Sequence, residues 1–316
     1  MAYYYKVKSR KVRKNYLLQK EGFAAWSQRA HCQDFLLYPE NISPRLAIDE
    51  TSLSQGELYT FISSRDVRGR KGKLVAMIRS TRSEKIAQVL NHIPQTLRDQ
   101  VLEVTLDMAS SMRKVCDIAF PKATQVTDRF HVVRLIMDVM QHVRIDQRWK
   151  EIDKENQAIK RARARGSRHK PTVLSNGDTP KQLLARAKYA LYKLPHQWTK
   201  SQLHRISLLF QLYPNIDRAY RLAWDFRRIY EITEKAQAVQ AIRDWMARAH
   251  ESAIEHFEIA CDSIDNHLDG ILAFFTNRST NAHAESFNAQ IKLFRANLRG
   301  VNNQKIFLYR LQKVFA

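Results

Sequence analysis

Between residues 44 and 128, short apolar runs and helix-like stretches follow one another in an order that few folds can accommodate. Three strand-like runs come first, separated by turns that contain Gly, with the sequences RLAIDETSL, LYTFISSRD and KLVAMIRS. An amphipathic helix follows in SEKIAQVLNHI, where apolar residues recur at intervals of three and four. A strand (LEVTLD), a helix (MRKVCDIAF) and a last strand (ATQVTD) complete the order.

This order of elements predicts an α/β protein with a mixed five-stranded sheet. Three antiparallel strands are joined by hairpins, and helical crossovers add two parallel strands. Such an arrangement is that of the ribonuclease-H-like fold. After Asp128 apolar residues recur at intervals of three and four, which predicts an all-α insertion into the fold. Four tryptophans are expected to fill the core of that insertion: Trp149, Trp198, Trp224 and Trp245.

These patterns divide the chain into four segments. Residues 1–43 are a basic N-terminal segment with interspersed aromatic residues, suited either to lying along phosphates or to being a solvated tail. Residues 44–144 form the first part of the ribonuclease-H-like core, and residues 145–276 form the helical insertion. Within the insertion, residues 158–182 are too polar to pack and predict an exposed basic loop. Residues 277–316 return to the core as C-terminal helices.

The charge of the chain points to a polyanionic partner. There are 53 Lys and Arg residues against 31 acidic residues, for a formal net charge of +22. Such an excess repels itself unless a polyanion neutralises it, so nucleic acid is the first partner to consider. A basic protein without such a function and a protein bound to a membrane surface are the alternatives. No apolar run approaches the ~18 residues of a membrane-spanning helix, and no secretion signal is present, so we expect a cytoplasmic protein.

Two aspartates each end an apolar strand of the predicted sheet. Asp49 ends LAID and Asp107 ends VTLD, and the expected topology makes these strands neighbours, so their ends lie side by side. Taken singly, Asp49 is more often a turn residue and Asp107 more often an N-cap. Two converging carboxylates repel each other, and a hard divalent cation with oxygen ligands relieves that repulsion. The pair therefore indicates a divalent-cation site.

A third acid is needed to hold two cations about 3.5–4 Å apart, the arrangement that serves phosphodiester chemistry. Glu285 is the candidate, although by itself it is an ordinary helix residue. The segment NRSTNAHAESFNAQIKLFR places Asn281, Glu285, Asn288 and Lys292 on one helix face. A polar face with one acid and a following Lys suits metal and phosphate contact better than core packing. Lys292 and Arg295 are then expected to contact the DNA backbone.

Four strings of the sequence resemble, in order, the motifs of the DDE transposases of bacterial insertion sequences, in the ISL3 group. These strings are AIDETS, VTLDMASSMRKV, FPKATQVTDRFHVVR and TNAHAESFNAQIKLFR. The resemblance implies that Asp49, Asp107 and Glu285 bind two magnesium ions, with manganese able to substitute. It also implies that Asp128 and His131, in DRFH, lie beside the active site. His131 is also consistent with a hydrogen-bonded histidine at a helix start.

The resemblance further implies an activity and its partners. A transposase of this group cuts double-stranded DNA at the ends of a mobile element, joins the freed 3′-hydroxyl to target DNA, and acts as a homo-oligomer in the nucleoid. Two alternatives stay open: another nuclease of the same fold, such as a resolvase or a ribonuclease H, and an inactive DNA-binding protein derived from a transposase. Family members usually begin with a zinc ribbon and a helix-turn-helix, which this sequence lacks before residue 44. We therefore expect either a separate small DNA-binding protein from an upstream reading frame or a truncated copy.

Overall fold

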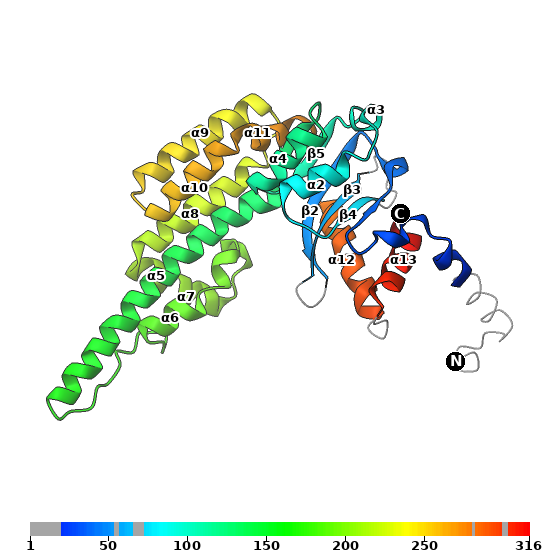
Figure 1. The fold of residues 1–316 in the computed structure, drawn as a ribbon. Helices are drawn as coiled ribbons and strands as arrows, with labels where there is room; N and C mark the ends of the chain where they lie inside the picture. The colour runs from blue at the N-terminus through cyan, green and yellow to red at the C-terminus, as the bar shows by residue number, and fades with distance from the viewer. Residues whose placement is uncertain (1–19, 54–56, 66–72, 280–281, 299–302) are drawn as a thin grey trace. The chain divides into compact units, whose positions relative to one another are not determined.

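The structure is a computed structural model, and it describes residues 20–53, 57–65, 73–279, 282–298 and 303–316. Its contacts divide the chain into two compact units (Figure 1). The first unit joins Met1–Asp128 to Ser279–Ala316, and the second unit is Arg129–Arg278. None of the helices in the described ranges combines the length and the apolar composition that crossing a membrane requires.

The first unit is built on a six-stranded sheet in the order β1-β4-β3-β2-β5-β6. Strands β2, β3 and β4 form an antiparallel meander, and β5 and β6 extend it in parallel from β2. This confirms the predicted ribonuclease-H-like order of three antiparallel and two parallel strands. The strands are β1 (Phe35–Leu37), β2 (Arg45–Ser52), β3 (Leu58–Ser64), β4 (Leu74–Ile78), β5 (Glu103–Leu106) and β6 (Thr124–Thr127).

The sixth strand, β1, is not predicted by the sequence, and it lies in the basic N-terminal segment, which the sequence suits either to lying along phosphates or to being a solvated tail. β1 pairs with β4 in antiparallel fashion, and a run of three residues carries no readable period by itself. Two aromatic residues of this segment also pack inward: Phe23 and Trp26 each lie 5.5 Å, between ring centroids, from Tyr309 of α13 (Gln304–Phe315). Residues 20–43 are therefore part of the first unit, and residues 1–19 lie outside the described residues.

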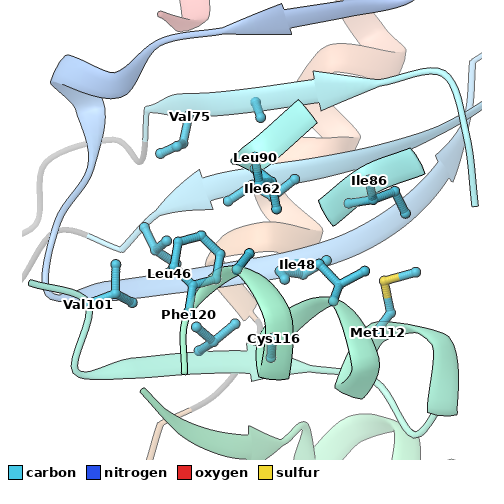
Figure 2. Packing of buried hydrophobic residues seen from close by; sticks show 14 of the residues in the cluster. Leu46, Ile48, Ile62, Val75, Ile86, Leu90, Val101, Met112, Cys116 and Phe120 are labelled. Carbon is cyan, nitrogen blue, oxygen red and sulfur yellow. The ribbon is translucent and has the colours of Figure 1, made fainter. Parts of the chain in front are cut away.

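Helices cover both faces of the sheet. On one face, α2 (Ser83–Leu90) and α4 (Ser110–Ala119) bury an aliphatic core that includes Leu46 and Ile48 of β2 (Figure 2). On the other face, α12 (Ala282–Asn297) and α13 pack on aromatic residues of β3, including Phe61. Because successive strand residues alternate between faces, β2 sends Leu46 and Ile48 to α2 and α4 and sends Asp49 to the face of α12. A short helix, α3 (Gln95–Arg98), lies between α2 and β5 in the chain.

The regular elements of the second unit are all helices, as the sequence predicts. Its core is aromatic: Trp245 is fully buried and contacts Phe226, with 4.6 Å between ring centroids. Trp224 is also buried, but Trp149 is 60% exposed, so the prediction that it fills the core is wrong. The helices are α5 (Arg129–Ala164), α6 (Pro180–Arg186), α7 (Lys200–Leu212), α8 (Pro214–Ile229), α9 (Lys235–Glu251), α10 (Glu255–Asn266) and α11 (Leu268–Asn277).

The division between the two units differs from the predicted one. The predicted boundary between residues 144 and 145 falls inside α5, which runs unbroken from Arg129 to Ala164. The contacts instead divide the chain between Asp128 and Arg129. A continuous helix hides a boundary from sequence analysis, because its apolar period continues without a turn residue that would mark a new unit.

The predicted basic loop is also shorter than expected, because α5 includes residues 158–164. Lys, Arg and Ala dominate these residues and are strong helix formers. The remaining residues up to α6 are mostly exposed, with one clear exception. Asp178 is buried and accepts hydrogen bonds from Arg186, from Arg205 Nε at 3.1 Å and from Asn176 Nδ2 at 2.9 Å.

Replacing Asp178 by Ala is expected to destabilise the second unit by about 2–3 kcal/mol, because it removes the acceptor for the hydrogen bonds from two charged groups, Arg186 and Arg205. Burial alone would raise the pKa of this carboxyl, but the hydrogen bonds from Arg205 and Arg186 lower it below its usual value. Its stabilising contribution is therefore present above the usual Asp pKa and lost as the pH falls through the lowered folded-state value. Urea unfolding at neutral and acidic pH measures both effects.

The matched control is Asp217→Ala, which removes a surface ion pair with Arg221, whose side chain is 73% exposed. Surface pairs contribute about 0–1 kcal/mol. Equal losses of stability in the two variants would contradict the role given to Asp178.

Candidate active site

Asp49 and Asp107 lie at the same level on neighbouring parallel strands. In the pairing of β2 with β5, Ala47 stands opposite Thr105. Two residues further along each chain come Asp49 and Asp107. The register of the sheet therefore places both aspartates level with the carboxyl end of β5, although Asp49 lies in the middle of β2.

Strand alternation predicts that both aspartates belong to the same face of the sheet. Their chain neighbours Ile48 and Leu106 are part of the aliphatic core under α2 and α4, so alternation directs the aspartates to the opposite face. Phe61, which stands opposite Asp49 on β3, belongs to the aromatic core beneath α12 and α13. Asp49 thus lies on the face of α12, and Asp107, the residue that follows β5, stands level with it on the adjacent parallel strand.

Asp128 extends this arrangement to the third parallel strand. β6 pairs Thr127 with Leu106, and the next residue, Asp128, donates its backbone N–H to the carbonyl of Leu106 at 2.8 Å. Asp128 therefore stands level with Asp107, and its side chain is buried, with 2% exposed. The nearby Arg65 interacts electrostatically with Asp128, but its Nη1 already binds Glu103 Oε1 at 3.0 Å.

Glu50 is a further acid of this region that the sequence analysis missed. Burial raises the pKa of its carboxyl, and the charges of Asp107 and Asp49 raise it further. A raised carboxyl pKa means that a further negative charge is disfavoured at this position. A bound cation would relieve the repulsion between these carboxylates. The signal in the sequence is its position, since Glu50 directly follows Asp49.

Glu285 reaches this part of the molecule through α12. It stands in the first turn of that helix, where the helix dipole favours a carboxylate. One turn later, Asn288 donates from Nδ2 to Asp49 Oδ2 at 2.6 Å. At about 100° per residue, Glu285, Asn288 and Lys292 lie within about 60° of one another around the helix axis. Glu285 therefore stands one helical turn from a residue that contacts Asp49.

The three predicted metal ligands do not form a ready-made cluster. Within the described residues, no three His, Cys, Asp or Glu side chains are gathered closely enough to hold a metal ion as they stand. Glu285 is exposed on the flank of α12. Carboxylates repel one another when no cation lies between them, so their side chains are expected to turn together only when one binds. The donors are carboxylate oxygens, which fit magnesium or manganese and not a soft metal.

The other predicted site residues fall into different surroundings. Lys292 is exposed, whereas Arg295 lies over the ring of Phe307, with 4.6 Å from its guanidinium carbon to the ring centroid. His131 is half-buried near the start of α5 in the second unit. Asn281 lies outside the described residues. Roles for these four residues at the site stay predictions.

A comparison with protein families decides the relationship of the chain. The model of a transposase family, that of the DDE transposases of the ISL3 group, matches residues 46–311, which contain all the acids described above. The chain belongs to this transposase family. The resemblance seen in the four sequence motifs is thereby confirmed.

Two curated relatives are similar to this member of the family. Both are the transposase for insertion sequence element IS1557, from two strains of Mycobacterium tuberculosis. Each is 24% identical over 253 residues, which are 79% of this chain and 55% of the relative. The chain thus spans about half the length of the curated relatives it matches. Among solved structures, the Drosophila P element transposase strand transfer complex is similar over 87% of this chain and 77% of that chain, with a TM-score of 0.41 and 13% identity.

Proposed function

We propose that this transposase cleaves double-stranded DNA at the ends of a mobile element and joins the freed 3′-hydroxyl to target DNA. The observation that carries the proposal is the placement of Asp49 and Asp107, level on adjacent parallel strands, with α12 bonded to Asp49. The DDE transposase family generally uses divalent metals. Asp49, Asp107 and Glu285 would hold two magnesium ions, for which manganese can substitute, and Asp128 would add negative charge beside them.

The roles of the residues follow from in-line displacement at phosphorus. When bound, a pair of divalent cations supplies positive charge that stabilises the attacking and the leaving oxygen. Asp49 would contact both ions, while Asp107 and Glu285 would each complete the ligands of one. The reaction requires no covalent enzyme intermediate. The buried thiols are also poor nucleophiles, because burial raises the pKa of Cys116 and of Cys261, the latter to about 11.

We assign DNA contact first to residues 160–170, which are the far end of α5 and the start of the loop that follows it. We name this segment the α5 tip. No acidic residue occurs between Glu155 and Asp178. Within the described part of the chain, none of the basic residues of the α5 tip forms an ion pair with an acid. These six exposed residues are Lys160, Arg161, Arg163, Arg165, Arg168 and Lys170.

The surroundings of the α5 tip support a role in binding phosphates. Figure 1 shows the far end of α5 extending past α6 and α7, so other helices of the second unit leave it uncovered. Cations at a helix C-terminus are favoured by the helix dipole. Their mutual repulsion is relieved when they bind DNA phosphates, and the counterions that were condensed on the DNA are released.

An assay of cleavage and joining tests the proposed function. The purified protein is incubated with DNA duplexes that carry the element ends, a target plasmid, and magnesium, manganese or a chelator, with and without any small protein encoded upstream. Cleavage and joining that both require the metal are the expected result. Cleavage without joining would indicate another nuclease of this fold, and DNA binding without cleavage would indicate an inactive DNA-binding protein. Mass photometry of the DNA complex measures whether a homo-oligomer forms.

A further inference from the structure

One polar side chain interrupts the apolar face of α12. The buried stripe of this helix consists of Ala284, Phe287, Asn288 and Ile291, and Asn288 is only 4% exposed. Its Nδ2 donates to Asp49 Oδ2, but its Oδ1 is buried without any hydrogen-bond partner. The amide nitrogen of Asn288 therefore has a hydrogen-bond partner in the first unit, and the amide oxygen has none.

Packing does not explain an amide at this position. A buried carbonyl oxygen without a partner costs free energy, because it loses its hydrogen bonds to water. A leucine of similar size would continue the contacts of Phe287 and Ile291 without that cost. What offsets the cost is the bond to the Asp49 carboxylate, since a hydrogen bond to a charged acceptor is stronger than a neutral one.

We propose that Asn288 is a positioning residue that holds the Asp49 carboxylate in the orientation needed for cation binding. The inference rests on the proposed function. Asp49 is held from two sides, because its Oδ1 accepts the backbone N–H of Glu50 at 2.8 Å while its Oδ2 accepts from Asn288. The same bond ties α12, one helical turn after Glu285, to the middle of β2.

The chemistry of the amide suits this task better than that of a charged side chain. Asn288 donates a hydrogen bond without adding charge to a region that already contains Asp107 and Glu50 near Asp49. An acid at position 288 would increase the repulsion between carboxylates, and a lysine would neutralise Asp49 and compete with the cation. A partner bonded to a metal ligand fixes that ligand's orientation, and its loss typically weakens metal binding about 10–100-fold.

The test compares manganese binding in the absence of DNA. Electron paramagnetic resonance counts free Mn²⁺ during titration of the intact chain, its Asn288→Leu variant and its Asp49→Asn variant. We expect Asn288→Leu to bind Mn²⁺ about tenfold more weakly while its melting temperature stays equal or rises. Restoring the amide on a longer side chain with Asn288→Gln should recover part of the affinity.

The matched control is Gln290→Leu, which removes an exposed amide from the same helix and should leave Mn²⁺ affinity unchanged. Unchanged affinity in Asn288→Leu would overturn the positioning role and leave the proposed function standing. If the intact chain and Asp49→Asn bind Mn²⁺ alike, the proposed metal site itself fails. Should Asn288→Leu not fold, Asn288→Ala removes the same donor without added bulk, and normal affinity in that variant would equally overturn the role.

Discussion

Asp107→Asn is expected to lower metal-dependent DNA cleavage by about 10³-fold, which corresponds to ~4 kcal/mol of transition-state stabilisation. The fold should survive, because the backbone N–H of Ala109 donates to Asp107 Oδ1 at 2.8 Å and an asparagine oxygen can accept the same bond. DNA affinity without metal should stay equal or rise slightly, since the substitution removes a negative charge that repels phosphates. Initial cleavage rates and filter binding measure the two quantities separately.

A matched control for Asp107→Asn is Asp117→Asn, which changes an exposed aspartate of α4 that accepts a hydrogen bond from Gln125. The control removes the same charge from the same unit without touching the strand ends, so its cleavage rate should equal that of the unaltered protein. Cleavage by Asp107→Asn at the unaltered rate would remove Asp107 from the mechanism. A parallel loss of cleavage and DNA affinity would instead point to misfolding or to a binding role.

The strands and the level of the two aspartates could be predicted because both depend on local patterns. Short apolar runs bounded by turn residues mark β2, β3 and β4. The crossover rule then places β5 beside β2, which brings Asp107 level with Asp49. β1 could not be predicted in this way, because its three residues become a strand only by pairing with β4. Its identity depends on a long-range contact that no local period records.

The contact between Asn288 and Asp49 shows a second limit of sequence analysis. The spacing on α12 predicts that Glu285 and Asn288 share one helix face, but it does not show which of the polar residues turns inward. That choice depends on how the helix is rotated against the sheet, and the packing of Phe287 and Ile291 fixes that rotation. Interpreting the whole polar face as a site of metal and phosphate contact therefore does not single out Asn288, which is buried against the first aspartate of the site.

Neutralising the α5 tip is expected to weaken DNA binding on the order of 10²-fold at 0.15 M salt. Each Arg→Gln change at Arg163, Arg165 and Arg168 removes one cation that releases a counterion when it meets a phosphate. The slope of log K against log salt should therefore become shallower by about two to three. Fluorescence anisotropy over a salt series gives both quantities. Cleavage of DNA that is already bound at low salt should be unchanged, because the acids of the first unit are untouched.

A triple variant elsewhere in the second unit controls for the loss of charge alone. Arg221, Arg228 and Arg248 each form ion pairs with Asp217 or Asp225. Because these acids already balance the three arginines, the arginines should release few counterions when DNA binds. Changing all three to Gln lowers the net charge by the same amount as the α5-tip variant. The salt slope should stay close to that of the unaltered protein. If both triple variants shift the slope equally, long-range charge rather than contact at the α5 tip drives binding, and the assignment of this surface fails.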